Sequence, residues 1–319
     1  MTTTSRDVFG AAAAEPAAPG SYGEAPRGGR LPDATHLGPV RLQIADLGRA
    51  LGFYQDVLGL RVLDGEAGRA SLGAQGDRRV LVELNERPGA RPARRGARLG
   101  LYHYAILLPD RASLGRLVRH FADAGVHAGA RDHLVSEAFY LTDADGLGIE
   151  VYADRPRSTW RRVGRELMMA TDPVDVADLL RAAGDSRWTG MPAGTVIGHV
   201  HLHVGDLARA AAFFSEALGF DRITWSYPGA LFLSAGGYHH HLGTNTWVAP
   251  GAASPSAHEA RLLEWTVELP DANGIAEAAQ RMDDAGHLAE RVADGEVVAT
   301  DPWGTDVRLR VAPRSRREG

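Results

Sequence analysis

The sequence predicts an α+β protein built from four tandem βαβββ modules, arranged in two similar halves. Internal repeats indicate this architecture. The repeated stretches are residues 38–47 with 198–207, 102–110 with 263–271, and 142–146 with 300–304, at offsets of 160, 161 and 158 positions. Repeats this regular are architectural, because each copy encodes the same supersecondary unit.

The composition is that of an ordinary globular protein. A length of 319 residues favours two domains over one small core. The net charge of −5 and the pI of about 6.2 give no reason to expect nucleic acid or an anionic membrane as a partner. The absence of cysteine excludes disulfides, thiolate zinc sites and cysteine nucleophiles, and it is typical of a cytoplasmic protein. No apolar run is long enough to span a bilayer.

The first module begins with an alternating strand at residues 38–44. Asp46 is expected to cap the following helix, whose apolar residues recur at helical spacing until Gly59 ends it. Three short strands complete the module, at residues 61–63, 70–72 and 80–84.

The second module repeats this order, with a strand at residues 101–109 and a helix at about 110–125. A hairpin follows, in which residues 138–141 and 149–152 form the strands. The Asp- and Gly-rich residues 143–146 supply the turn between them. Because the second half repeats the first, modules three and four are expected to have the same elements in the same order.

These modules divide the chain into two domains, a linker and two tails. We predict a disordered tail at residues 1–34, a domain of two modules at 35–155, a linker with a short helix at 156–195, a second domain of two modules at 196–312, and a polar tail at 313–319.

Glu150 is the first residue that suggests chemistry. It stands between Ile149 and Val151, so a carboxylate interrupts an apolar strand. Burying an unpaired carboxylate is costly, so Glu150 faces water, pairs with a cation or binds a metal. A solvent-facing position is the better interpretation unless other candidate ligands converge on the same place.

Three phrases of the sequence resemble one known family. Residues 136–140, 146–156 and 238–247 are similar to the two-domain, catechol 2,3-dioxygenase-like branch of the vicinal oxygen chelate superfamily, and the resemblance covers residues 38 to 312. That superfamily also contains glyoxalases and bleomycin-resistance proteins. The resemblance implies that the modules pair into two open β-barrels, with ligands for a metal on the first and last strands of a module.

The resemblance also implies a ligand set. The first-strand positions here are Pro39, His103, His199 and Glu264, and the last-strand positions are Glu83, Glu150, His241 and Arg308. His103, Glu150 and His199 are therefore the predicted metal ligands, because two His and one carboxylate are the set used by non-haem Fe(II) oxygenases. Mn(II) accepts the same ligands.

This ligand set departs from that of familiar extradiol enzymes, which take their ligands from modules three and four. Here the ligands come from modules two and three, which requires those two modules to share a barrel. Modules one and four would then form a metal-free structural copy, with Pro39 and Arg308 at ligand positions.

Further residues are assigned by the resemblance to acid–base chemistry and substrate binding. His133 and Tyr140 precede Glu150 as a His and a Tyr do in the family. In the family, a histidine near the bound oxygen acts as acid and base. Three consecutive histidines lie at that place here, His239, His240 and His241, and alignment with the family phrase through Leu242 and Asn245 favours His241. Trp247, Phe139 and Phe232 are candidate pocket walls. Taken alone, His103 is better interpreted as a hydrogen-bonded core residue, and His239 to His241 as part of a polar loop.

The predicted function is that of an extradiol dioxygenase, which opens a catechol next to its diol with O₂ at Fe(II), in the breakdown of aromatic compounds. One alternative is a glyoxalase-like isomerase or lyase, which would need a second carboxylate where His241 stands. Another is a metal-free small-molecule binding or resistance protein. The resemblance leaves a homo-oligomer open, and the sequence does not specify which catechol is used.

Overall fold

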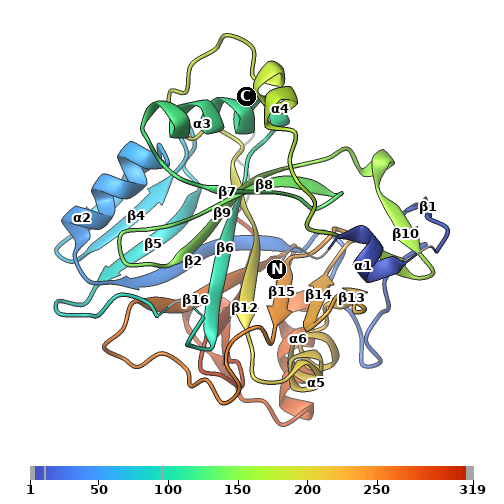
Figure 1. Cartoon of the computed structure of the whole chain (residues 1–319). Coiled ribbons are helices and arrows are strands. Elements are labelled where there is room, and N and C mark those ends of the chain that lie inside the picture. The colour runs from blue at the N-terminus through green and yellow to red at the C-terminus, as the bar shows by residue number, and fades with distance from the viewer. Residues whose placement is uncertain (1–3, 11, 95, 314–319) are drawn as a thin grey trace, which may run out of the picture.

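The computed structural model describes residues 4–10, 12–94 and 96–313, and it contains two eight-stranded sheets flanked by helices (Figure 1). We call one the inner-module sheet, because modules two and three form it. Its strands, in spatial order, are β13 (Asp221–Thr224), β14 (Ala230–Ser234), β15 (Leu242–Asn245), β12 (Val196–His203), β6 (Gly100–Leu107), β9 (Gly148–Asp154), β8 (Ser136–Thr142) and β7 (Gly129–Asp132).

The outer-module sheet has the same plan and is formed by modules four and one. Its strands, in spatial order, are β17 (Ala289–Arg291), β18 (Val297–Thr300), β19 (Asp306–Val311), β16 (Arg261–Leu269), β2 (His36–Ile44), β5 (Val80–Glu86), β4 (Arg69–Gly73) and β3 (Arg61–Glu66). At the centre of each sheet, β12 is antiparallel to β6 and β16 is antiparallel to β2. The prediction that module two pairs with module three is therefore confirmed.

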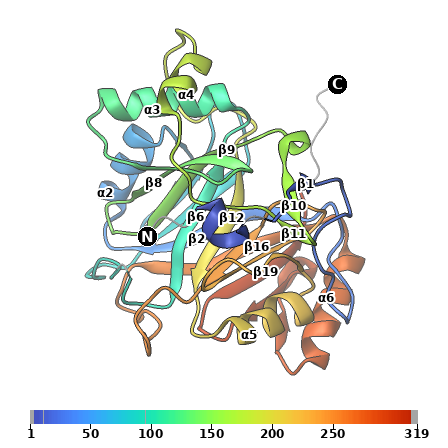
Figure 2. The same ribbon diagram turned by 45° about the vertical axis from the view of Figure 1, so that its right-hand side comes forward.

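Helices cover the outside of both sheets. Their bounds are α1 (Ser5–Phe9), α2 (Leu47–Gly52), η1 (Phe53–Val57), α3 (Arg111–Asp123), η2 (Arg157–Thr159), α4 (Val176–Ala182), α5 (Leu207–Ala210), η3 (Ala211–Ala217), α6 (Ala272–Asp284) and η4 (Ala293–Gly295). Helices α2, α3 and α4 lie on one side of the molecule, while α5 and α6 lie on the other (Figures 1 and 2).

The four modules begin their helices in the same way. Asp46, Asp110, Asp206 and Asp271 each cap a helix by accepting a hydrogen bond from the backbone N–H three residues later. In modules one and three the helix widens into a π-helical segment, η1 or η3, directly after α2 or α5. The sequence repeat thus reproduces local structure as well as topology.

The segment before the first module is folded where the structure describes it. The side chain of Tyr22 is buried and donates to the Gly237 carbonyl, and Leu31 is buried with its backbone bound to Gly219. The expectation of disorder over residues 1–34 is therefore not met at these positions. Single apolar residues that bury against a distant part of the chain leave no periodic pattern in the sequence.

The structure describes only part of the two predicted tails. Residues 1–3 and 11 of the N-terminal tail and residues 314–319 of the C-terminal tail lie outside the described residues. In the linker, β10 (Arg161–Val163) and β11 (Glu166–Leu167) join β1 (Glu15–Pro16) in a small third sheet at the edge of the molecule (Figure 2). The division into domains at residues 35–155 and 196–312 stays a prediction.

Asp143 and Asp301 occupy equivalent turns and are both buried. Each accepts hydrogen bonds from two backbone N–H groups of its own turn, and Asp143 also accepts one from the Tyr54 hydroxyl. Burial nevertheless dominates and raises the pKa of each carboxyl from 3.8 to about 6. An acid of this kind binds its proton more readily in the folded state, so its cost to folding grows as the pH rises from about 4.

Replacing Asp143 with asparagine should therefore stabilise the protein at high pH and not at low pH. We expect the free energy of unfolding of Asp143→Asn minus that of wild type to be about 2 kcal/mol larger at about pH 8 than at about pH 4. Urea denaturation at both pH values measures this difference. Asp271→Asn, at an exposed helix cap, is the control. An equal effect of Asp143→Asn at the two pH values would contradict the prediction.

Candidate active site

Three side chains from three neighbouring strands meet on one face of the inner-module sheet. His103 comes from β6, Glu150 from β9 and His199 from β12. Glu150 Oε2 lies 3.0 Å from His103 Nε2 and 3.1 Å from His199 Nε2, and the two Nε2 atoms are 3.4 Å apart. One ligand atom from each residue lies within 4.8 Å of the others, which is the spacing of a metal site.

Strand register explains this convergence. Ala105 of β6 pairs with His199 on one side and with Glu150 on the other, so all three side chains point to the same face. His103 precedes Ala105 by two residues and shares that face by strand alternation. Residues that are 47 to 96 positions apart in the sequence are thereby brought together.

The charge state of these residues suits a cation. Burial raises the pKa of Glu150, but the charges and hydrogen bonds of His199 and His103 outweigh burial and hold that pKa well below its usual value. Burial lowers the pKa of His199. An ionised carboxylate and a neutral imidazole are the forms that bind metal.

Glu150 also lacks a partner that a metal would provide. Its Oε1 atom is buried and has no hydrogen-bond partner among the described residues. A buried carboxylate oxygen without a partner is costly, and a bound divalent cation would remove that cost. The donor set of His103, Glu150 and His199 therefore fits a metal ion of the kind bound by two His and one carboxylate.

His133 and Tyr140 lie together beside these residues. The His133 Nδ1 atom is 2.6 Å from the Ala170 carbonyl oxygen, so Nδ1 carries the hydrogen and donates a hydrogen bond to that oxygen. His133 Nε2 is then the acceptor for the Tyr140 hydroxyl at 2.6 Å. Tyr140 pairs with Glu150 across β8 and β9, and burial raises the pKa of its hydroxyl well above the usual value.

The three consecutive histidines have different surroundings. His240 lines the cavity that contains the metal-site residues, and its ring centroid lies 4.0 Å from that of His199. His241 does not line that cavity. Its Nδ1 atom lies 2.9 Å from Ser234 Oγ and 3.3 Å from the Ala235 backbone nitrogen, and its ring packs between aromatic residues of the core.

The resemblance predicts that His241 faces the metal site, whereas in the structure His240, and not His241, lines the cavity. The reason is local. Strand β15 begins at Leu242, so His239, His240 and His241 belong to the loop before it. Alternation along a strand does not fix the direction of side chains in that loop.

The cavity has a volume of about 980 Å³, far more than a simple catechol fills. Trp247 and Phe232 line it as predicted, and Phe139 does not. Lining residues that the sequence analysis did not single out include Tyr102, Tyr227, Met169 and Thr171. Met169 and Thr171 come from the predicted linker, where no repeat or family phrase marked them.

His201 and His203 also line the cavity, on the same strand as His199. The amide of Asn245 lies between them, with Nδ2 at 2.9 Å from His201 Nε2 and Oδ1 at 2.7 Å from His203 Nδ1. Burial lowers the pKa of His201 well below its usual value. These two histidines are held by the protein and are separate from the candidate metal site.

The outer-module sheet carries an ion-pair network at the equivalent positions. Arg308 binds Glu264 through two parallel contacts of 2.8 Å, and Arg41 contacts both Glu83 at 2.8 Å and Glu264 at 3.4 Å. Arginine cannot ligate a cation, and here its guanidinium neutralises the carboxylates. Within the described residues, His103, Glu150 and His199 form the single group with metal-site spacing.

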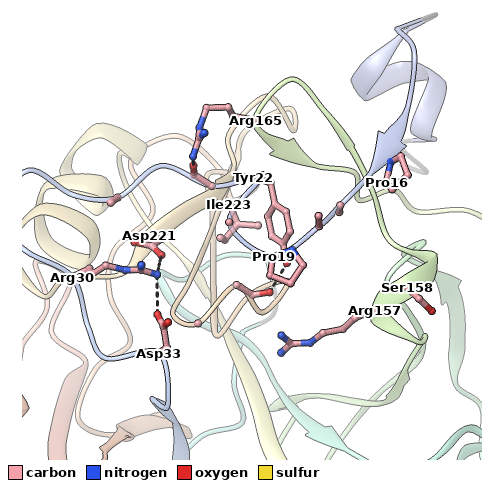
Figure 3. A pocket seen from close by; sticks show the side chains of 17 residues that line it. Pro16, Pro19, Tyr22, Arg30, Asp33, Arg157, Ser158, Arg165, Asp221 and Ile223 are labelled. Carbon is pink, nitrogen blue, oxygen red and sulfur yellow. Dashed lines mark hydrogen bonds and ion pairs between the residues drawn. The ribbon is translucent and has the colours of Figure 1, made fainter.

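A second cavity of about 560 Å³ lies between the N-terminal segment and the loop after β14 (Figure 3). Its residue Arg30 is bound to Asp33 at 3.0 Å and Asp221 at 2.7 Å. The described residues that line it include no histidine, so it lacks the metal chemistry of the larger cavity.

Among the residues that the structure describes, each helix is too short or too polar to cross a bilayer.

Comparisons with known proteins agree with this geometry. Residues 36–151 and 196–311 both match a family model described as the Glyoxalase/Bleomycin resistance protein/Dioxygenase superfamily. The chain is 47% identical over 260 residues to catechol-2,3-dioxygenase of Bacillus subtilis (strain 168), covering 80% of this chain and 90% of that protein. It is 30% identical over 193 residues to 2,2',3-trihydroxybiphenyl dioxygenase of Sphingomonas paucimobilis, covering 59% and 57% of the two chains.

Solved structures share the fold. A putative dioxygenase from Bacillus subtilis subsp. subtilis str. 168 superposes with a TM-score of 0.62 at 13% identity, covering 90% of this chain and 87% of that one. Glyoxalase I from Zea mays superposes with a TM-score of 0.51 at 18% identity, covering 86% and 92%. The predicted fold class is thereby confirmed.

Proposed function

This chain belongs to the Glyoxalase/Bleomycin resistance protein/Dioxygenase superfamily, and we propose that it is an extradiol dioxygenase that opens a catechol with O₂. The observation that carries the proposal is the meeting of His103, Glu150 and His199 on one face of the inner-module sheet, inside a cavity with room for a catechol and its substituents. The relationship to a catechol-2,3-dioxygenase over 80% of the chain supports it.

We assign the metal to His103, Glu150 and His199, with Fe(II) as the ion and Mn(II) as an ion that the same ligands accept. When bound, Fe(II) supplies a Lewis acid that favours the ionised catechol, together with a path for electrons between catechol and oxygen. The protein holds these three ligands on rigid strands, so their positions are fixed before the substrate arrives.

The remaining residues bind, orient and move protons. We infer that His240 takes a proton from the substrate and returns it to the product, because it lines the cavity beside His199. Tyr140 is oriented by His133 and presents its hydroxyl beside the ligands, where it can hydrogen-bond a substrate oxygen. Trp247, Phe232 and neighbouring aromatic side chains wall the cavity and keep water from the aromatic ring.

The chemistry of the cavity argues against a glyoxalase-like isomerase. That reaction needs a second carboxylate as the base, whereas the described lining residues include only Glu150 and Glu259 as carboxylates. Glu259 is bound by the Arg98 guanidinium. The position expected to hold the base is occupied by histidine.

Three further expectations belong to this proposal. The reaction takes up both atoms of O₂ and needs no reductant, so the partners are a catechol and oxygen. We expect the protein to act in the cytoplasm. A homo-oligomer formed through exposed sheet edges stays a prediction.

Oxygen uptake tests the proposal. After anaerobic reconstitution with Fe(II) or Mn(II), we expect one O₂ consumed per catechol, with a product whose mass equals catechol plus O₂. With ¹⁸O₂, both labelled atoms should appear in the product by mass spectrometry. Zn(II)-loaded and chelator-treated protein are the controls. The assignment is wrong if neither the Fe(II)-loaded nor the Mn(II)-loaded protein takes up oxygen with any of a panel of 3- and 4-substituted catechols.

A further inference from the structure

A row of hydrogen-bonded side chains leads from the buried His240 away from the cavity to the partly exposed Asp154. His240 Nδ1 lies 2.7 Å from His239 Nδ1, and His239 Nε2 lies 3.0 Å from Asp154 Oδ1. The Tyr238 hydroxyl donates to the same carboxylate oxygen at 3.1 Å, and it lies 2.7 Å from the Tyr152 hydroxyl. Asp154 ends the strand that carries Glu150, so the row is attached to the frame of the metal site.

Resting on the proposed function, we propose that Asp154 and His239 are positioning residues that hold the ring of His240 and determine which of its nitrogens faces the cavity without a proton. Asp154 is a carboxylate acceptor, so the proton on His239 sits at Nε2. In a neutral His239 the Nδ1 atom then has a lone pair and accepts a hydrogen bond. Its neighbour at 2.7 Å, His240 Nδ1, must be the donor.

The consequence for His240 follows from the chemistry of imidazole. A neutral ring with its proton on Nδ1 has a free lone pair on Nε2. The Nδ1 edge of His240 is turned toward His239, so Nε2 is the nitrogen left for the cavity that the ring lines. His240 is thereby presented as a base for the hydroxyl of a bound substrate.

The surroundings favour a single arrangement of this row. His239 is fully buried, and its ring packs against Tyr238, Tyr152 and Trp160. These contacts and the hydrogen bond to Asp154 favour one orientation of the ring. Arg157 lies over the rings of Trp160 and Tyr238, at 5.4 and 5.7 Å, and so covers the outer side of the row.

Paired substitutions test this role. His239→Phe keeps the ring and removes both hydrogen bonds, whereas His239→Asn keeps an amide acceptor where Nδ1 stood. Likewise, Asp154→Leu removes the acceptor for His239, and Asp154→Asn retains an amide oxygen there. We expect His239→Phe and Asp154→Leu to lower kcat per bound metal by about 10-fold or more, with KM for catechol changed by less than about twofold. His239→Asn and Asp154→Asn should recover most of kcat.

A second readout does not depend on activity. In metal-free protein labelled with ¹⁵N-histidine, the His240 signals, assigned by comparison with His240→Gln, should show a protonated Nδ1 and an unprotonated Nε2. In His239→Phe this preference should be lost. Wild-type kcat per bound metal in His239→Phe, an equal loss in His239→Asn, or a protonated Nε2 in wild type would overturn the proposal. If wild type cleaves no catechol, the proposed function fails, and the NMR measurement still decides the role of His239.

Discussion

Glu150→Gln is expected to abolish metal binding at working concentrations and, with it, ring cleavage. Glutamine keeps the shape of the side chain but removes the charge that pairs with both imidazoles and that would bind the cation. We expect the affinity for Fe(II) to fall by more than about 100-fold, since even residues that only support ligands cost 10–100-fold. Turnover should fall by at least about 1000-fold. Metal content after gel filtration and oxygen uptake measure the two effects.

Glu83→Gln is the matched control for this experiment. Glu83 occupies the last-strand position of module one, as Glu150 does in module two, but it pairs with Arg41. We expect Glu83→Gln to retain one metal ion per chain and wild-type turnover. Activity that is indifferent to Glu150→Gln, or equal loss of metal in the two variants, would remove the basis of the assignment.

His240→Gln should lower kcat per bound metal by about 10²–10⁴-fold, the range for loss of a general acid or base. The reason is its position, since His240 lines the cavity beside His199. The protein should still bind the metal, because His240 is not one of the three clustered ligands. Steady-state oxygen uptake, corrected for metal content, measures the effect.

His241→Gln provides the contrast, because the alignment and the structure disagree on which of the two histidines acts. His241 is buried among core residues, and burial lowers the pKa of its ring to about 3, so it stays neutral. We expect its replacement to lower the unfolding midpoint while kcat per bound metal stays within about threefold of wild type. The opposite pattern, with His241→Gln inactive and His240→Gln active, would restore the alignment-based assignment.

Much of the fold could be predicted because short local sequence signals specify each helix and strand, and the same signals recur in each module. The N-cap aspartates and Gly59 each act on a single helix, and their repetition reveals the module. The ligand positions followed from the family phrases around Glu150, and the structure brings His103 and His199 to it. The pairing of modules two and three had to be inferred, because strand pairing between modules depends on contacts that no local pattern encodes.

The differences between the sequence-based expectations and the structure have physical causes of the same kind. His240 and His241 lie in a loop before β15, so the directions of their side chains depend on the loop conformation. A shift of one position there decides which side chain lines the cavity. The burial of Tyr22 and Leu31 depends on surfaces formed by residues about 200 positions later. Met169 lines the cavity because the linker passes beside it, and the linker has no periodic pattern from which that position could be predicted.

The exchange of modules between the two halves has a consequence for biosynthesis. On the ribosome, β2 and β6 emerge early, but their antiparallel partners β16 and β12 are translated only with the second half of the chain. Until then the nascent chain carries two half-built sheets whose open edges can pair with another copy. Protecting these edges until the second half has been made would therefore reduce aggregation of the nascent chain.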